Sequence, residues 1–234
     1  MLFSSDCQGQ DFSELIAARR SCRICPNRNP GKIHNGSSFN FDPNVVSYWS
    51  QWLGHAEPLI LIVGQDFGDT DYFEEFRGAD DPENDTNQFL YELLVHIGLT
   101  PAPPPTLDQR TRVFLTNSVL CLKEPPMNSQ LRDPWVRSCA INHLRPLANK
   151  LKPPIIVAMG GPAWLAAQIA FEIENVPEKI KAAAGGMWPT KTGGQVFAVG
   201  HCGRLGQGNR PWHKQLDDWS RIGTALKLIS ETPG

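Results

Sequence analysis

The chain has 234 residues, of which 41% are apolar, and this is enough for one well-filled hydrophobic core. Its net charge of −2 excludes a generally polybasic protein, although a local basic groove can form on a nearly neutral chain. No apolar run approaches the roughly 20 residues of a membrane span. The N-terminus lacks a basic region followed by an apolar one, so we expect a cytoplasmic protein that makes no membrane contact.

The N-terminal part combines a short helix with a pair of cysteines. Residues 12–20 predict a helix that Asp11 can cap. Cys22 and Cys25 follow as a C-x-x-C pair, which places two thiols in one turn and suits a single metal ion or cluster. Disulfides are rare in the cytosol, so a metal or cluster site is the favoured use of such cysteines. Residues 27–57 predict a long irregular connection, with a short helix at 45–53.

An unalternating apolar run at residues 59–63 is typical of a strand that is buried on both faces of a parallel α/β sheet. Gln65 and Asp66 follow this run directly. Open α/β sheets bind their ligands beyond the carboxyl ends of the strands. We therefore expect the floor of an active site here, with Asp66 as a catalytic carboxylate. An acidic turn that merely ends the strand is the alternative.

Strands and helices alternate along the rest of the chain. Residues 73–87 predict an acidic loop, after which Thr86 can cap a helix that ends at Gly98. Further strands are predicted at 112–119, 154–160 and 195–199, and further helices at 135–151 (kinked at Pro146), 163–173 and 212–229. This alternation predicts a three-layer α/β/α sandwich around a mostly parallel four-stranded sheet.

Three of the predicted strands end in side chains that can do chemistry, namely Asp66, Asn117 and His201. The carboxyl ends of parallel strands meet at one edge of a sheet, so we expect these three residues to lie near one another. A lone histidine at a strand end is more often structural than functional. Its combination with a carboxylate and an amide favours a functional site.

The motifs resemble the uracil-DNA glycosylase superfamily. The motifs that carry the resemblance are GQD, TNSVLC, PPIIVAMGGPAW and VGHCGRL, in that order over residues 22–219. The body of the chain is most similar to the iron–sulfur, family 4-like branch. Asp66 instead resembles the acid of the family 1 motif GQDPYH, where the iron–sulfur branch usually has GEAPG. The chain thus combines a family 1-like acid with a family 4-like body.

The resemblance implies a metal centre. In the iron–sulfur branch four cysteines hold a [4Fe–4S] cluster, and the matching residues here are Cys22, Cys25, Cys121 and Cys139. Zinc would suit four thiols equally well on spacing alone, but the resemblance favours the cluster. Cys7 and Cys202 fall outside the set. We assign one domain over residues 1–234, with a cluster-bound N-terminal segment and inserted loop at 1–57 and an α/β core at 58–234.

The resemblance also implies a monofunctional DNA glycosylase, which flips a pyrimidine out of DNA and hydrolyses its N-glycosidic bond. Asp66 would orient the attacking water and stabilise the oxocarbenium-like sugar. His201 would stabilise the negative charge that develops on the leaving base. The remaining implied roles are a base pocket formed by Gln65, Asn117 and Phe67, a DNA wedge at Leu205, and phosphate contacts by Arg204 and Arg210.

Two departures from the family pattern bear on the substrate. His201-Cys202-Gly203 stands where the family has His-Pro-Ser, and no aromatic residue occurs near Pro82, where the family stacks a Phe on the base. A pocket without that wall favours a bulky modified pyrimidine, such as the hydroxymethylated or glucosylated cytosine of phage DNA, which would indicate antiviral defence. Uracil in base-excision repair is the second substrate hypothesis. A catalytically silent iron–sulfur DNA-binding protein is the alternative function, and we expect a monomer in each case.

Overall fold

The structure is a computed structural model that describes residues 12–39, 54–79, 81, 83–101 and 111–231. Two predictions lie outside the described residues, namely the capping role of Asp11 and the short helix at 45–53. Cys7 and Pro82 lie outside them as well.

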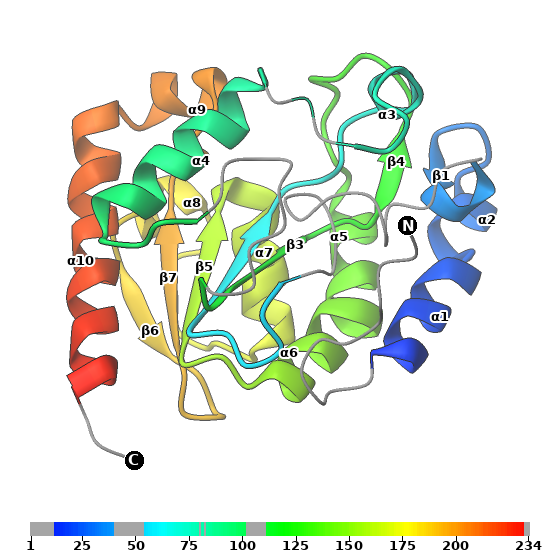
Figure 1. The fold of residues 1–234 in the computed structure, drawn as a ribbon. Helices are drawn as coiled ribbons and strands as arrows, with labels where there is room; N and C mark the ends of the chain where they lie inside the picture. Colours follow the sequence, from blue (N-terminus) through cyan, green and yellow to red (C-terminus); the bar gives the residue numbers. More distant parts are fainter. Residues whose placement is uncertain (1–11, 40–53, 80, 82, 102–110, 232–234) are drawn as a thin grey trace.

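A five-stranded sheet forms the centre of the fold, with the strand order β3-β2-β5-β7-β6 (Figure 1). The strands are β2 (Ile60–Gly64), β3 (Val113–Asn117), β5 (Ile155–Met159), β6 (Met187–Pro189) and β7 (Gln195–Val199). β3, β2, β5 and β7 run parallel, as predicted, whereas β6 pairs antiparallel with β7 at the edge. The predicted number of four strands was wrong, because the sheet has β6 as a fifth strand at its edge. β6 consists of three partly exposed residues, so it has no apolar run from which a strand could be predicted.

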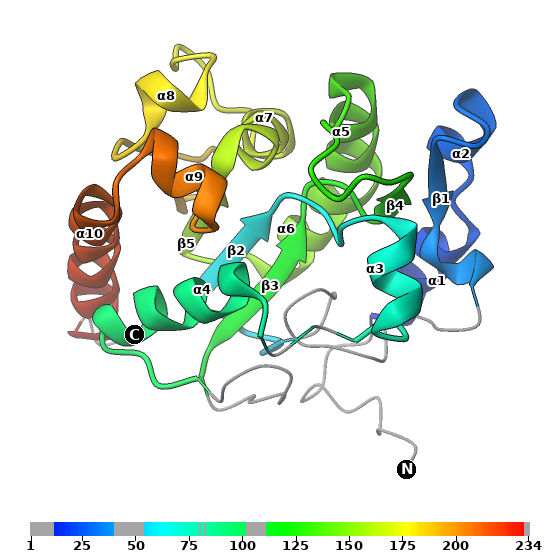
Figure 2. The ribbon, with the colours of Figure 1, turned by 90° about the horizontal axis from the view of Figure 1, so that it is seen from above.

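Different helices cover the two faces of the sheet, because side chains alternate along each strand. Ile60 and Ile62 of β2 pack in one cluster with α4 (Asp85–His96) and α10 (Trp212–Glu231). Leu61 and Val63 pack in a second cluster with the helices between residues 133 and 170. Figure 2 shows these two groups of helices on opposite sides of the strands. The predicted three-layer α/β/α sandwich is confirmed.

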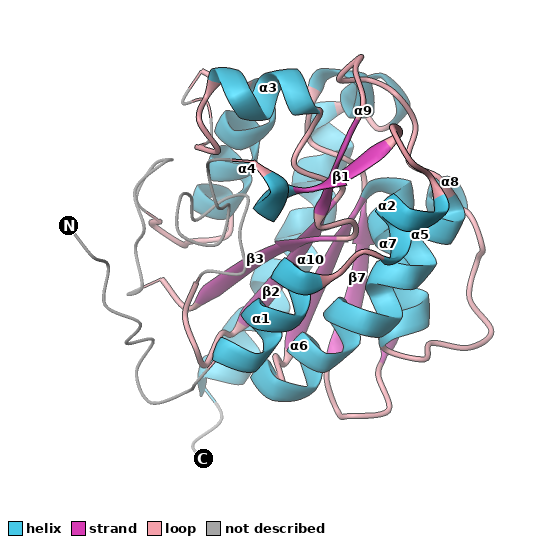
Figure 3. Cartoon of the chain, turned by 90° about the vertical axis from the view of Figure 1, so that its right-hand side faces the viewer, coloured by secondary structure: helices cyan, strands magenta, loops and turns pink. Residues whose placement is uncertain are grey.

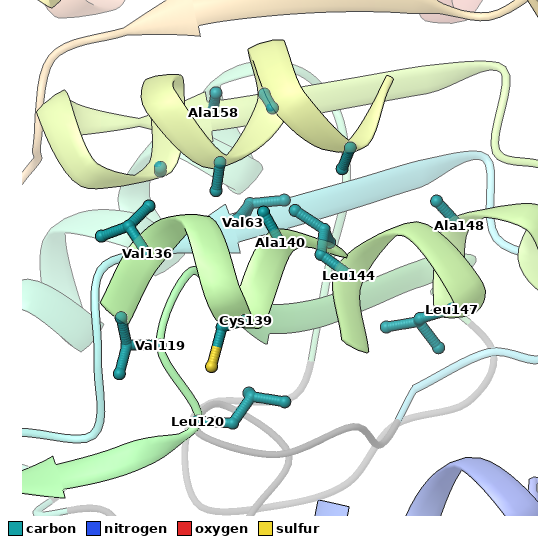
Figure 4. Packing of buried hydrophobic residues seen from close by; sticks show 14 of the residues in the cluster. Val63, Val119, Leu120, Val136, Cys139, Ala140, Leu144, Leu147, Ala148 and Ala158 are labelled. Carbon is teal, nitrogen blue, oxygen red and sulfur yellow. The ribbon is translucent and has the colours of Figure 1, made fainter. Parts of the chain in front are cut away.

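The second face is covered by a helical run with one interruption. It consists of α5 (Asp133–Cys139), the π-helical segment η3 (Ala140–Leu144) and α6 (Arg145–Leu151), and α7 (Gly160–Ala170) packs beside it. The interruption precedes Pro146, because a proline has no N–H to continue the helical ladder and the turn before it is wider. In Figure 4, Ala140 and Leu144 lie beside Val63, and Cys139 points towards Leu120.

The N-terminal segment is joined to the core by a second, two-stranded sheet. α1 (Ser13–Ser21), α2 (Ile24–Arg28) and the 3-10 turn η1 (Gly36–Ser38) surround β1 (Ile33–Asn35). β1 pairs antiparallel with β4 (Cys121–Lys123), which follows β3 in the chain. Figure 3 shows α1, α2 and β1 together on one side of the molecule. The sequence did not predict β1 or β4, because three-residue strands leave no periodic signal.

Three short helices and one cap differ from the predictions. α3 (Thr70–Glu75) extends into the segment that was predicted as a loop, and Asp69 caps it by accepting a hydrogen bond from the Tyr72 N–H at 2.9 Å. α4 is capped by Asn84 rather than by Thr86, whose own N–H donates to the Asn84 side chain. α8 (Ile180–Ala183) and α9 (Arg204–Asn209) were not predicted. Within the described ranges no helix is long and apolar enough to cross a membrane.

Candidate active site

The predicted site residues follow strands that end at one edge of the sheet. β2 and β3 pair in parallel register, with Gly64 opposite Asn117. A Cβ atom at Gly64 would lie 2.5 Å from the Asn117 Oδ1 atom, so only glycine leaves room for the amide there. A Cβ atom at Gly160, which follows β5, would lie 3.2 Å from the His201 Cβ atom. His201 therefore lies over the end of β5, beside the strand that leads to Asp66.

Asp66 is almost fully buried, with 9% of its side chain exposed. Its Oδ1 atom accepts a hydrogen bond from the Gly68 N–H at 3.1 Å, and its Oδ2 atom accepts one from the Lys123 Nζ at 2.8 Å. The pKa of the Asp66 carboxyl is raised above its ordinary value, because burial raises it by more than the Lys123 charge and the hydrogen bonds from Lys123 and Gly68 lower it. The carboxylate is thus held in one orientation by two donors.

Lys123 is a site residue that the sequence reasoning missed. Its side chain is only 3% exposed, and its partner is the Asp66 carboxylate. It ends β4, and its N–H donates to the Gly68 carbonyl at 3.4 Å, so β4 contacts the loop that carries Asp66. The available signal was a lysine directly after an apolar run, since a lysine is almost never fully buried without a partner.

His201 is oriented by the chain that follows it. Its Nδ1 atom accepts a hydrogen bond from the Gly203 N–H at 3.2 Å, so in the neutral ring the proton resides on Nε2. Burial lowers the pKa of His201, and the Lys123 charge lowers it further. The ring is therefore neutral at pH 7 and has one N–H to donate. The Lys123 charge lowers the pKa of both Asp66 and His201, so both residues lie near this lysine and belong to one site.

The loops after β2 and β3 hold each other. The Ser118 N–H donates to the Gly64 carbonyl at 2.9 Å, and the Ser118 Oγ donates to the Gln65 carbonyl at 2.7 Å. Gln65 is thus held through its backbone beside Asn117. Phe67 is 8% exposed and belongs to the hydrophobic cluster on the face of α5 to α7. Phe67 thus packs in the core directly after Asp66, and its part in a base pocket stays a prediction.

The predicted DNA-contacting residues lie on and beside α9. Leu205 is 78% exposed. A Cβ atom at Gly206 would lie 1.9 Å from the His201 carbonyl oxygen, so α9 starts directly against the site. Arg204 forms an exposed ion pair with Asp85. Arg210 contacts the buried Asp218 through two nitrogen atoms, each at 2.5 Å, so its guanidinium anchors the loop to α10.

The four predicted metal ligands come from α1–α2, β4 and α5. Cys121 pairs with Asn35 across the β1–β4 sheet, and the Asn35 amide donates to the Cys22 carbonyl at 2.8 Å. Burial, together with Cys25 and Cys22, raises the pKa of Cys139 to about 12. Burial also raises the pKa of Cys121, and Cys139, Cys25 and Cys22 contribute to that rise. All four side chains therefore lie in one region.

These four cysteines form no disulfide. Among the described residues, however, no group of three or more potential ligands has the geometry of a metal site. The donor set itself, four thiols from three separate segments, has the chemistry that an iron–sulfur cluster or zinc requires. Cys202 lies apart in the cluster on the α4 and α10 face, where its Sγ donates to the Thr86 carbonyl.

Two hollows in the described part of the surface lie away from these residues. One is lined by Leu59, Gly98, Thr111, Arg112 and Leu226, at the ends where β2 and β3 begin. Parallel α/β sheets place ligands at the opposite ends of their strands. We therefore place the candidate site at Asp66, Lys123 and His201 and not at this hollow.

An α/β/α sandwich with an acid, an amide and an imidazole at its strand ends has the layout of an α/β enzyme. The family model of the uracil DNA glycosylase superfamily matches residues 52–218, more than half of the chain. The chain therefore belongs to the uracil DNA glycosylase superfamily. This membership implies DNA glycosylase activity in general and hence a DNA substrate. No curated protein matches the chain.

The close approach of Gly64 to Asn117 predicts a local steric effect. Gly64→Ala should lower the free energy of unfolding by about 1–3 kcal/mol, because the added methyl group overlaps the Asn117 amide. Gly208→Ala, where a Cβ atom would meet open space, is the matched control and should leave stability within about 0.5 kcal/mol or raise it. Urea denaturation measures both. Equal stability of the two variants would contradict the close approach.

Proposed function

We propose that the chain is a monofunctional DNA glycosylase, which flips a pyrimidine out of DNA and hydrolyses its N-glycosidic bond as a monomer. The observation that carries the proposal is the arrangement around Lys123, where a buried Asp66 carboxylate and a neutral His201 share one edge of the sheet. Hydrolysis of an N-glycosidic bond needs a proton acceptor for water and a donor for the leaving base. This site supplies both.

Asp66 is the proposed catalytic carboxylate. As the base leaves C1′, positive charge develops on the deoxyribose, and a nearby carboxylate stabilises it. The same carboxylate orients the attacking water and accepts one of its protons, so that the products are the free base and an abasic site. The Gly68 and Lys123 donors hold its two oxygen atoms, which reduces the reorganisation needed during the reaction.

His201 is the proposed stabiliser of the leaving base. Its Nε2–H can donate to a pyrimidine oxygen that becomes negative as the bond breaks, because Nδ1 already accepts from Gly203. The Asn117 amide, which has a donor and an acceptor, is suited to recognise the edge of the pyrimidine. The Gln65 backbone, held by Ser118, supports the same wall of the pocket.

Leu205 is the proposed wedge, since it is an exposed apolar side chain on the helix that starts against His201. An apolar side chain can fill the gap that a flipped base leaves in the duplex. Arg204 lies beside it and is exposed, so it can exchange the Asp85 carboxylate for a phosphate. The two contacts of Arg210 with Asp218 favour a supporting role in which it holds the loop.

We propose a bulky modified pyrimidine, such as a hydroxymethylated or glucosylated cytosine of phage DNA, as the preferred substrate. Small residues lie against the imidazole, namely Gly160, which begins α7, and Gly203, two residues after His201. Uracil, in base-excision repair, is the alternative substrate. Antiviral defence is the role that a phage-specific base would indicate.

The four cysteines are the proposed ligands of a [4Fe–4S] cluster, with zinc as the less favoured ion. The proximity of their thiols and their origin in three segments support this proposal. Such a cluster would cross-link the N-terminal segment to β4 and α5 and would supply no step of base excision.

Asp66→Asn should lower kcat for base excision by about 10²–10⁴-fold, because a neutral amide cannot accept a proton from water. DNA binding, measured by fluorescence anisotropy, should be preserved. Asp71→Asn, an exposed carboxylate on α3, is the matched control and should keep full activity. Wild-type activity in Asp66→Asn would remove this carboxylate from the mechanism.

The substrate is tested with duplexes that carry uracil, hydroxymethylcytosine or glucosylated hydroxymethylcytosine, followed by alkali to cleave abasic sites. We expect faster cleavage of the modified cytosines than of uracil, because small residues surround His201. Cleavage of uracil alone would contradict the enlarged pocket. No cleavage of any duplex, with DNA binding retained, would favour a catalytically silent iron–sulfur DNA-binding protein of the same fold.

The metal centre is tested by elemental and sulfide analysis of protein purified without oxygen. We expect a brown protein that contains iron and acid-labile sulfide, and Cys121→Ser should lose both. Cys202→Ser, a buried cysteine outside the set, should retain them. A colourless protein that contains zinc would refute the cluster.

A further inference from the structure

Lys123 brings a buried positive charge to the site, and the proposed mechanism uses only the hydrogen bond that it donates to Asp66. Lys123 lies on β4, outside the strand-end residues that the motifs single out. Its side chain is 3% exposed, and its Nζ atom is 2.8 Å from the Asp66 Oδ2 atom. A lysine is almost never buried to this extent, because removing an ammonium ion from water costs several kcal/mol. Because burial of the Lys123 ammonium is this unfavourable, we expect the residue to have a role in the site.

We propose that Lys123 is a positioning residue for base excision, whose ammonium group keeps the Asp66 carboxylate ionised and turned towards the attacking water. The inference rests on the proposed function, since it assigns Asp66 as the proton acceptor. Lys123 itself acts through Asp66 and does not touch the reacting atoms.

Geometry gives the first support. Asp66 has two oxygen atoms, and the Gly68 N–H binds Oδ1 while Lys123 binds Oδ2. Of these two donors only Lys123 is charged. A charge-assisted hydrogen bond is roughly twice as strong as a neutral one, so Lys123 holds the carboxylate more strongly than the Gly68 N–H does. Its backbone is held as well, because Lys123 pairs with Ile33 across the small sheet and with the Asp69 segment. The Lys123 side chain is thus held at its Cα atom by the strand pairing and at its Nζ atom by Asp66.

Electrostatics gives the second support. The charged and titratable groups that face Asp66 are Lys123 from β4, Asp69 from its own loop and, through Lys123, His201 after β7. Burial and Asp69 both raise the pKa of Asp66, and Lys123 is the charge that opposes them. Burial lowers the pKa of His201, and the same positive charge lowers it further. Removing the charge would therefore raise the pKa of both groups.

The pH profile of kcat tests this assignment, because a purely structural role would leave its shape unchanged. Asp66 is active when ionised, so kcat should rise with pH through the pKa of Asp66 and stay high above it. In Lys123→Met the acidic limb should move to higher pH by about two units or more, so kcat at pH 7 should fall by about tenfold or more with little change in KM. Lys123→Arg, which keeps the charge, should restore the position of the limb.

A double-mutant cycle separates action through Asp66 from an independent role. If Lys123 acts through Asp66, the variant Asp66→Asn/Lys123→Met should be no slower than Asp66→Asn alone. Lys191→Met is the matched control, because Lys191 also pairs with carboxylates, Glu172 and Glu174, but is exposed. It should show the wild-type pH profile. Additive losses in the double variant would overturn the inference.

A measurement without substrate keeps the inference testable if no duplex is cleaved or if Lys123→Met does not fold. Carbon NMR of carboxyl-labelled aspartate, with the Asp66 signal assigned from Asp66→Asn, gives the pKa of Asp66 directly. We expect an ionised Asp66 at pH 7 in the wild-type protein and a higher pKa in Lys123→Met. A protonated Asp66 in the wild type would overturn the inference. So would borohydride trapping of a covalent DNA complex that requires Lys123, since the amine would then be a nucleophile.

Discussion

The contact between Asp66 and Lys123 places two opposite charges together in a region that excludes water. Each charge loses several kcal/mol of hydration, so the pair is stable only where close geometry and further hydrogen bonds compensate. The surrounding structure provides both. Glycine at the end of β2 leaves space for the neighbouring amide, the loop after β3 holds the loop after β2, and β4 presents the lysine at hydrogen-bonding distance. The strand ends, the small sheet and the loop of Asp66 thus form one mutually dependent unit.

Much of the α/β core could be predicted from the sequence, because each buried parallel strand is a short apolar run, and three of these runs lead into a polar side chain at or just after the strand end. Asp66, Asn117 and His201 were predicted at one sheet edge for that reason, and the structure brings them there. The edge strand β6 and the helices α8 and α9 were not predictable in the same way. They are three to six residues long, which is too short for an apolar period to appear.

The role of Lys123 could not be predicted, because a lysine ordinarily points into solvent and its partner lies 57 residues earlier in the chain. Phe67 follows Asp66 directly, and its apolar ring is buried in the core, so its part in a base pocket stays a prediction. The four cysteines were predicted as a set from the family resemblance, and their thiols do lie in one region, although among the described residues no group of three or more ligands has the geometry of a metal site.

The three-residue strand β4 carries Cys121 at one end and Lys123 at the other, and its partner β1 belongs to the N-terminal segment. A rigid element that touches two sites transmits displacement from one to the other, and any free-energy coupling between them is reciprocal. Oxidative damage at the cysteines would then slow base excision without altering a single group in the pocket. Conversely, a flipped nucleotide held against Asp66 would protect the cysteines from exchange. In that case oxidation of the cysteines and binding of DNA would both shift the same conformational equilibrium of β4.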